Sequence, residues 1–318
     1  MPLIIVTTSP RVAPGLLSHQ AWQALRSGRV LTGSADHPHL PYLFEAGIEV
    51  EVVRPDFRAL AAEAGEGTVV WLAAAEDEDF MRGVGMAAMG MADPPLIEVV
   101  PGSYDLPGAR MLDLVAVMER LRAECPWDRR QTHETLLPYL LEEAYEVQEA
   151  VEQGDYAALR EELGDVLLQV VFHARVAGDF DVDDVAEGIV AKLKRRHPHV
   201  FGSVQVADAD EVNSNWETIK AAERAAKGED SPLASVPMGQ PALALAAQLI
   251  RRAGRAGAPE RLAQAVGQGV GRELFDLVRR AQAAGVDPEA ELRKAARAYR
   301  ARVEAWLSRD ADGGSPDD

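Results

Sequence analysis

The sequence contains a single cysteine, few aromatic residues and no long hydrophobic run. Cys125 has no second cysteine with which to form an intramolecular disulfide. No apolar segment approaches the about 18 residues that a membrane-spanning helix needs. The N-terminus also lacks the charged-then-apolar pattern of a secretory signal peptide. These absences predict a cytoplasmic protein that does not enter a membrane.

Basic residues are scarce relative to acidic ones. The chain has 33 Lys and Arg against 51 Asp and Glu, which gives a net charge of −18. Proteins that bind nucleic-acid polymers or anionic membranes need a basic surface to neutralise phosphates, so we expect neither partner. A nucleotide substrate would need a local basic pocket or a metal ion.

The composition is sufficient for packed cores, since 47% of the 318 residues are hydrophobic. Residues 1–107 alternate short apolar runs with helical stretches, a rhythm that predicts a small α/β domain with a parallel or mixed sheet. Two helical segments, 108–230 and 231–318, follow a turn-rich linker. The expected strands are residues 3–6, 30–31, 48–53, 69–72 and 96–100.

Residues 136–176 place acids in two predicted helices. Glu143 and Glu146 share one helical face, and Glu162 and Asp165 share a face of the next helix. The second helix is apolar on nearly every side, so we expect it to be buried. An unpaired carboxylate in such surroundings costs several kcal/mol. Oxygen-only ligands of this kind suit a hard divalent cation, and Mg²⁺ uses a few carboxylates together with substrate phosphates.

Gly164 stands beside Asp165 in the interior of the second helix. Glycine there costs about 1 kcal/mol relative to alanine. Its presence predicts that another helix or a ligand comes close. The acids on a single helix face are usually only solvated. Two pairs of acids on consecutive helices favour a functional site instead.

The motifs around these acids resemble a known family. The array EExxE, followed after 15 residues by ExxD, lies between CPWDRRQTHETL and the segments KLKRRHPHVFG and NWETIK. This arrangement resembles the MazG family of nucleoside triphosphate pyrophosphohydrolases. The resemblance implies an all-α catalytic domain over 108–230 that uses Mg²⁺, with Mn²⁺ as an alternative. It also implies hydrolysis of nucleoside triphosphates to a monophosphate and pyrophosphate, as house-cleaning of the nucleotide pool. The implied metal ligands are Glu143, Glu146, Glu162 and Asp165, with Glu142 close by.

Two groups of residues are candidates for substrate binding. One is the densest basic cluster, in which Lys192 and Arg195 share a helical face suited to gripping phosphates. The other comprises aromatic residues that could stack on a base, one of them with a lysine one turn away. The alternatives are solvated charges and packed tryptophans. The full set is Lys192, Arg195, Arg196, Trp216, Lys220 and Trp127.

The sequence shows no Ser, Cys or His nucleophile pairing, so we expect direct attack by water with Glu142 or Glu143 as the base. A carboxylate-bridged di-iron bundle would require an ExxH motif on two helices, which neither acidic helix carries. A non-catalytic regulator that binds nucleotide or a protein partner is the remaining alternative. Two short acidic helices cannot enclose a nucleotide by themselves, which predicts a homodimer.

The two flanking segments resemble other modules more loosely. DHPHLPYLFEAGIEVEVV is similar to part of the tetrapyrrole methylase domains, but TTSPR replaces their glycine-rich loop, so binding of S-adenosylmethionine is not expected. Residues 231–318 look like a degenerate repeat of the acidic helices. In that repeat Gly269 and Arg272 stand where Glu162 and Asp165 stand in the first copy. The tail DADGGSPDD is expected to be disordered.

Overall fold

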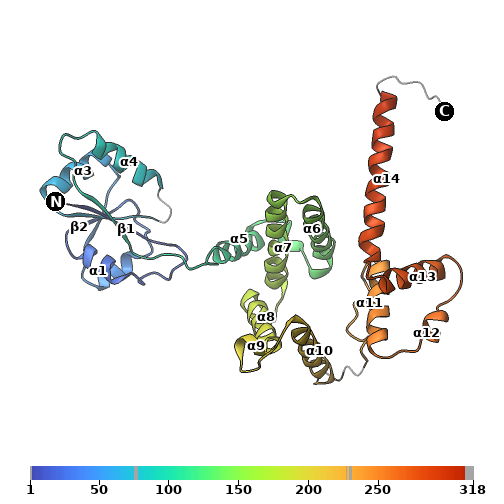
Figure 1. Cartoon of the computed structure of the whole chain (residues 1–318). Helices are drawn as coiled ribbons and strands as arrows, with labels where there is room; N and C mark the ends of the chain where they lie inside the picture. The colour runs from blue at the N-terminus through green and yellow to red at the C-terminus, as the bar shows by residue number, and fades with distance from the viewer. Residues whose placement is uncertain (1, 75–77, 227, 229–230, 312–318) are drawn as a thin grey trace. The chain divides into compact units, whose positions relative to one another are not determined.

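The computed structural model of the protein describes residues 2–74, 78–226, 228 and 231–311 (Figure 1). The chain divides into two compact units, Met1–Ala186 and Glu187–Asp318. The first unit contains a five-stranded sheet followed by helices, and the described part of the second is helical. The predicted class, mainly helical with a small α/β domain at the N-terminus, is confirmed. The predicted boundaries at residues 107 and 230 stay a prediction, as does the disordered tail, most of which lies outside the described residues.

The sheet is parallel, with the strand order β3-β2-β4-β1-β5. Ile4 of β1 lies opposite Val70 on one side and Glu98 on the other. All five strands were expected from the sequence, because each is a short β-branched or apolar run bounded by turns. The strands are β1 (Leu3–Thr7), β2 (Arg29–Thr32), β3 (Val50–Val52), β4 (Val69–Leu72) and β5 (Ile97–Pro101).

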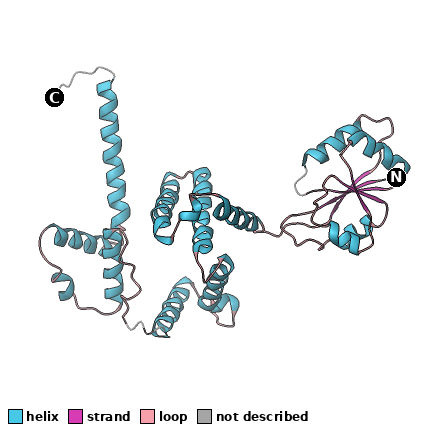
Figure 2. Ribbon diagram, turned by 180° about the vertical axis from the view of Figure 1, so that it is seen from behind, coloured by secondary structure: helices cyan, strands magenta, loops and turns pink. Residues whose placement is uncertain are grey.

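Helices cover both faces of this sheet (Figure 2). One face packs against the first two helices through Leu25 and Leu43. The other packs against the next two, where Trp71 of β4 stacks on Phe80 with 4.4 Å between ring centroids. The four helices are α1 (His19–Leu25), α2 (Leu40–Glu45), α3 (Phe57–Glu66) and α4 (Glu78–Met89). The resemblance of this domain to methylases stays a prediction.

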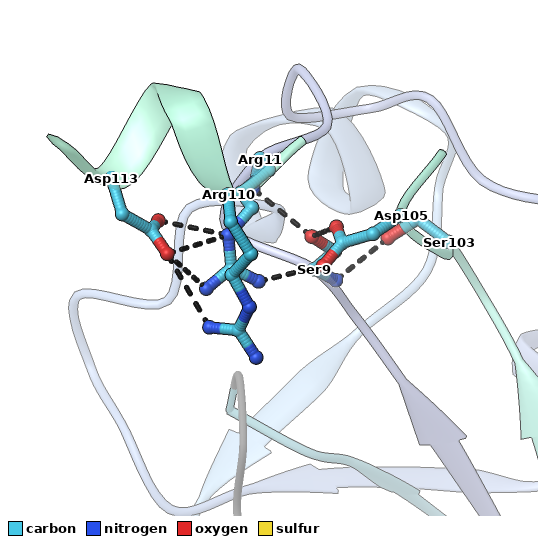
Figure 3. A network of polar contacts seen from close by, with 6 residues as sticks. All are labelled: Ser9, Arg11, Ser103, Asp105, Arg110 and Asp113. Carbon is cyan, nitrogen blue, oxygen red and sulfur yellow. Dashed lines mark hydrogen bonds and ion pairs between the residues drawn. The ribbon is translucent and has the colours of Figure 1, made fainter. Parts of the chain in front are cut away.

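A polar network joins the loop after β1 to the helix α5 (Arg110–Glu124) (Figure 3). Arg11 donates from Nε to both carboxylate oxygens of Asp113, at 2.8 and 2.9 Å, and from Nη1 to Asp105 at 2.7 Å. The Ser9 amide donates to Ser103 Oγ at 2.8 Å. The Arg11 side chain is only 6% exposed, so both carboxylates hold a nearly buried cation. The loop with the sequence TTSPR therefore holds the start of α5.

The remaining helices of the first unit form a second core. Met118 of α5, Leu136 of α6, and Val171 and Phe172 of α7 are almost completely buried together. The rings of His133, at the start of α6, and of His173, in the last turn of α7, stack with centroids 5.2 Å apart. The helices are α6 (His133–Gln153) and α7 (Tyr156–Val176), preceded by the 3₁₀ turn η1 (Asp128–Arg130).

The helices that follow begin with α8, which crosses the boundary between the units. Val278 of α13 and Ala247 of α11 are buried in the small core of the second unit. Gly269, aligned in the sequence with Glu162, is the N-cap of α13 with a φ of 77°, whereas Glu162 lies inside α7. The internal repeat therefore stays a prediction. The helices are α8 (Val182–Arg196), α9 (Pro198–Phe201), α10 (Ala209–Ala226), α11 (Ala242–Arg255), α12 (Arg261–Gln264), α13 (Val270–Ala283) and α14 (Pro288–Ala311).

Among the helices described, none combines the length and the apolar composition that crossing a membrane requires.

Candidate active site

The acidic residues lie on an antiparallel helix pair whose ends are well defined. Thr132 is the N-cap of α6, accepting from the Thr135 amide, and the Thr135 side chain in turn accepts from the Thr132 amide. Gly154 ends α6 in the left-handed conformation, with a φ of 71°. Asp155 then caps α7 by accepting from the amides of Ala157 and Ala158 at 3.0 Å. This two-residue connection turns α7 back along α6.

The reversal brings acids of both helices together. One carboxylate oxygen each of Glu143, Glu146 and Glu162 lies within 4.8 Å of the other two. Glu143 and Glu146 are one turn apart on α6, and Glu162 faces them from α7. Three of the four predicted metal ligands therefore form one cluster.

The electrostatics of the cluster reflect the crowding of negative charge. Burial, a hydrogen bond with Glu146, and the charges of Asp165 and Glu162 raise the pKa of Glu143 to about 7. Burial and the charges of Glu146, Asp165 and Glu161 also raise the pKa of Glu162. No cationic side chain is among the causes of either shift. Like charges held this close favour an added cation.

Asp165 lies beside the cluster rather than within it. It is not one of the three residues whose oxygens lie within 4.8 Å, yet its charge acts on both Glu143 and Glu162. Glu142 is exposed on the neighbouring side of α6. The structure thus places Asp165 at the margin of the cluster and leaves Glu142 in solvent.

The environment of α7 differs from the sequence-based expectation in two ways. A Cβ added at Gly164 would meet no atom within 4 Å, so no other helix among the described residues approaches there, and the approach of a ligand stays a prediction. The helix was also expected to be buried, but Leu163 is 50% exposed and Leu167 is 37% exposed. The helices α5 and α6 bury the part of α7 that carries Val171 and Phe172. Leu163 and Leu167, near the acids, are therefore only partly covered by the described chain.

The donor set of the cluster fits a hard divalent cation. The three clustered ligands are carboxylates, and neither His nor Cys joins them among the described residues. Oxygen ligands of this kind are those that Mg²⁺, Mn²⁺ and Ca²⁺ take, whereas a structural zinc site uses sulfur and nitrogen. The di-iron alternative lacks its histidines here as well.

The predicted basic cluster belongs to the end of α8, where Lys192 is exposed. Arg195 and Arg196 both bind one carboxylate of α10. The two oxygens of Glu223 accept from Arg195 Nε at 2.6 Å and from Arg196 Nη2 at 2.6 Å. Hydrogen bonds from Arg196 and Arg195 hold the pKa of Glu223 down, to about 2. Sequence reasoning missed Glu223, although its spacing of three and seven residues from Lys220 and Trp216 puts all three on one face of α10.

Trp216 of α10 lies between two cations. The Lys220 ammonium is 4.2 Å from the centroid of its ring, and the Arg196 guanidinium carbon is 5.9 Å away. The indole nitrogen of Trp216 is buried and has no hydrogen-bond partner among the described residues. Trp216 and Lys220 are therefore in cation–π contact with each other, and their predicted role in substrate binding stays a prediction.

Trp127, the other aromatic candidate, lies in the first unit just before η1. It is 50% exposed and meets Tyr139 and Phe172 edge-on, with centroids 5.9 and 6.4 Å away. Half of the ring therefore packs on the helix pair, as the packing alternative expected, and the other half remains available to a ligand.

Comparisons with known proteins give the family context. A family model described as the MazG nucleotide pyrophosphohydrolase domain matches residues 131–201. The Streptomyces cacaoi protein named "uncharacterized 26.1 kDa protein in blaB 3′ region" is 52% identical over 225 residues, covering 69% of this chain and 92% of that protein. The nucleoside triphosphate pyrophosphohydrolase of Mycolicibacterium smegmatis is 48% identical over 161 residues, 49% of each chain. The Thermotoga maritima nucleoside triphosphate pyrophosphohydrolase/pyrophosphatase MazG is 39% identical over 217 residues, covering 59% of this chain and 81% of that protein. The chain thus spans about half the length of the Mycolicibacterium relative.

Proposed function

The chain belongs to the MazG family of nucleotide pyrophosphohydrolases, and we propose that its acidic helix pair hydrolyses nucleoside triphosphates to a nucleoside monophosphate and pyrophosphate. The observation that carries this proposal is the cluster of Glu143, Glu146 and Glu162, whose oxygens lie within 4.8 Å of one another. The names of the pyrophosphohydrolase relatives support the same reaction. The sequence-based assignment to this family and enzyme class is confirmed.

The carboxylates of α6 and α7 would hold the divalent cation that this chemistry needs. Glu143, Glu146 and Glu162 supply the clustered oxygens, and Asp165 adds charge from the margin. When bound, Mg²⁺ or Mn²⁺ would neutralise charge on phosphate oxygens and lower the pKa of a bound water. The oxygen-only donor set supports Mg²⁺ as the ion.

The acids of α6 also provide the base for the reaction. Water attacks the α-phosphorus, the bond from that phosphorus to the bridging oxygen breaks, and pyrophosphate leaves with the bond's electron pair. The water proton passes to Glu142 or Glu143. The exposed position of Glu142 and the half-buried position of Glu143 make both accessible.

The remaining predicted residues would bind the substrate. Lys192, Arg195, Arg196 and Lys220 would contact the phosphates, and Trp127 or Trp216 would contact the base. Support comes from the free ammonium of Lys192, which makes no ion pair with the described residues, and from the exposed half of the Trp127 ring. The pairing of Arg195 and Arg196 with Glu223 means that phosphate must compete with a carboxylate for them.

We further propose a homodimer, because the helix pair presents an apolar surface around its acids. A second copy of this pair would bury that surface and complete a four-helix arrangement. A cytoplasmic location and a role in nucleotide-pool house-cleaning stay predictions. The exposed apolar side chains of α6 and α7 include Leu137, Leu141, Tyr145, Leu163, Leu167 and Val170.

The test is phosphorus NMR of the products from a panel of nucleoside triphosphates with Mg²⁺ or Mn²⁺. We expect the signals of a monophosphate and pyrophosphate, and their loss in Asp165→Asn. Formation of only orthophosphate and a diphosphate would overturn the cleavage position. Absence of any turnover over the whole panel would favour the non-catalytic regulator.

A further inference from the structure

A cleft in the second unit gathers positive charge in an otherwise strongly acidic chain. It lies between α10 and α11 and has a volume of about 560 Å³, within the range of roughly 300–1,000 Å³ found for small-molecule sites. Five cations and one carboxylate line it, which gives a local net charge of +4 in a protein whose net charge is −18. The charged lining residues are Lys220, Arg224, Arg251, Arg252, Arg255 and Glu217.

The carboxylate does not neutralise this group. Glu217 Oε1 lies 3.3 Å from Lys220 Nζ and 3.4 Å from Arg255 Nη1, so it is shared between two cations. Burial opposes the ionised form of Glu217, but Lys220, Arg255 and Arg224 together still hold its pKa below the usual range. Four positive charges therefore remain in excess after Glu217 is counted.

Two of the arginines lack a hydrogen-bond or ion-pair partner among the described residues. Arg224 and Arg251 make no hydrogen bond or ion pair with any described residue, whereas Arg252 donates to Pro232 O at 3.1 Å and to Ser235 Oγ at 2.7 Å. Each of the free arginines also lies one helical turn from another cation of the cleft. Such like-charge neighbours repel each other unless an anion lies between them.

The neighbouring hollow on the other side of α11 shares Arg251 and Arg255 with the cleft and is also lined mainly by cations, but two of its arginines are paired with acids. On the other side of α11, Arg272 pairs with Asp276 at 2.6 Å, and Arg279 pairs with Asp276 and Glu260 at 3.3 and 2.5 Å. The chain thus supplies acids to Arg272 and Arg279 of α13, whereas Arg224 and Arg251 have no ion pair with an acid of the described residues.

We propose that the cleft between α10 and α11 binds a short phosphate chain, as found in inorganic pyrophosphate or in the tail of a nucleoside triphosphate. Guanidinium groups match phosphate oxygens in pairs, and several adjacent cations favour several adjacent negative charges over one. A long nucleic acid is disfavoured by the acidity of the remaining surface. The inference does not rest on the proposed hydrolysis, since binding requires neither turnover nor a divalent cation.

The test is isothermal titration calorimetry of the full-length protein in EDTA at low ionic strength, with inorganic pyrophosphate, a nucleoside triphosphate and orthophosphate as separate titrants. We expect pyrophosphate and the triphosphate to bind, orthophosphate to bind at least about tenfold more weakly, and affinity to fall as salt is added. No binding of pyrophosphate, or binding of the triphosphate alone, would overturn the proposal, because the second result would mean that the base is recognised.

Variants test whether pyrophosphate binds in this cleft. Replacing both free arginines, Arg224→Glu with Arg251→Glu, should weaken pyrophosphate binding at least about tenfold, and the milder pair of glutamine substitutions should weaken it less. Arg302→Glu on α14 makes the same exchange at one position outside the cleft, with half the charge change of the double variant, and should leave the affinity within about twofold. Asp165→Asn should also bind normally in EDTA. Equal affinity of the double variant and the wild type, or loss of binding in Asp165→Asn instead, would refute the assignment to this cleft.

Discussion

The carboxylate of Glu223 allows a quantitative prediction about the second unit. A carboxyl that titrates at about 2 instead of 4.5 is stabilised in its ionised form by Arg196 and Arg195. The difference sets a ceiling of about 3.4 kcal/mol on its contribution to folding. Since the Arg195 side chain is 54% exposed, solvent screening reduces the expected contribution to about 1–2 kcal/mol. Glu223→Gln should therefore destabilise the second unit by this amount at pH 7.

The sign of the pH dependence follows from the lowered pKa. The contribution is fully present above pH 4.5 and is lost as the pH falls towards 2, so the wild type and Glu223→Gln should converge in acid. Urea unfolding followed by tryptophan fluorescence measures this, because Trp216 lies against Arg196. Glu187→Gln, an exposed position on α8, is the matched control. An equal loss at pH 7 and pH 3 would show that the effect comes from packing and would refute the ion-pair reasoning.

Three further predictions concern the proposed active site and its surroundings. Glu143→Gln and Asp165→Asn should each reduce metal-dependent turnover at least about tenfold, a loss of 1.4 kcal/mol or more in transition-state stabilisation, with an unchanged helical circular dichroism spectrum; a variant that keeps more activity removes that residue from the site. Light scattering at micromolar concentration should give the mass of a dimer, and Leu163→Glu, which adds charge to the exposed face of α7, should shift it towards a monomer; a monomeric wild type contradicts this. Deleting residues 231–318 should leave metal-dependent hydrolysis per folded molecule in place but abolish pyrophosphate binding in EDTA; a folded, inactive truncation would mean that the C-terminal helices contribute to catalysis.

The elements and the acidic cluster were predictable because their causes are local. Short apolar runs specify the strands, and the spacing of the acids specifies which carboxylates share a helical face. The N-cap of α6 is local as well, because Thr132 directly before the helix has a side chain that accepts from the Thr135 amide. Family resemblance, rather than the acids themselves, indicated which phosphate bond is cleaved.

The features that escaped prediction depend on packing between distant segments. The hydrophobicity of α7 predicted burial, but whether a surface is covered depends on the helices available, and here Leu163 stays half exposed. Open space around Gly164 could not be read from its position in a helix. The roles of Glu223 and of the arginines of α11 depend on side chains of other helices. Glu223, for example, forms an ion pair with Arg196 of α8.

The two-residue turn at Gly154 and Asp155 has a consequence for the order in which the molecule forms. All the clustered acids lie within one helical hairpin, so their approach requires closure of a short loop and no contact with the sheet. Helix formation takes about a microsecond or less, and contacts between neighbouring helices form faster than the long-range pairing of parallel strands. The acidic hairpin can therefore assemble before the parallel strands have paired. A divalent cation present during synthesis would then stabilise the hairpin early, and folding rates of the helical region should depend on Mg²⁺ while those of the sheet should not.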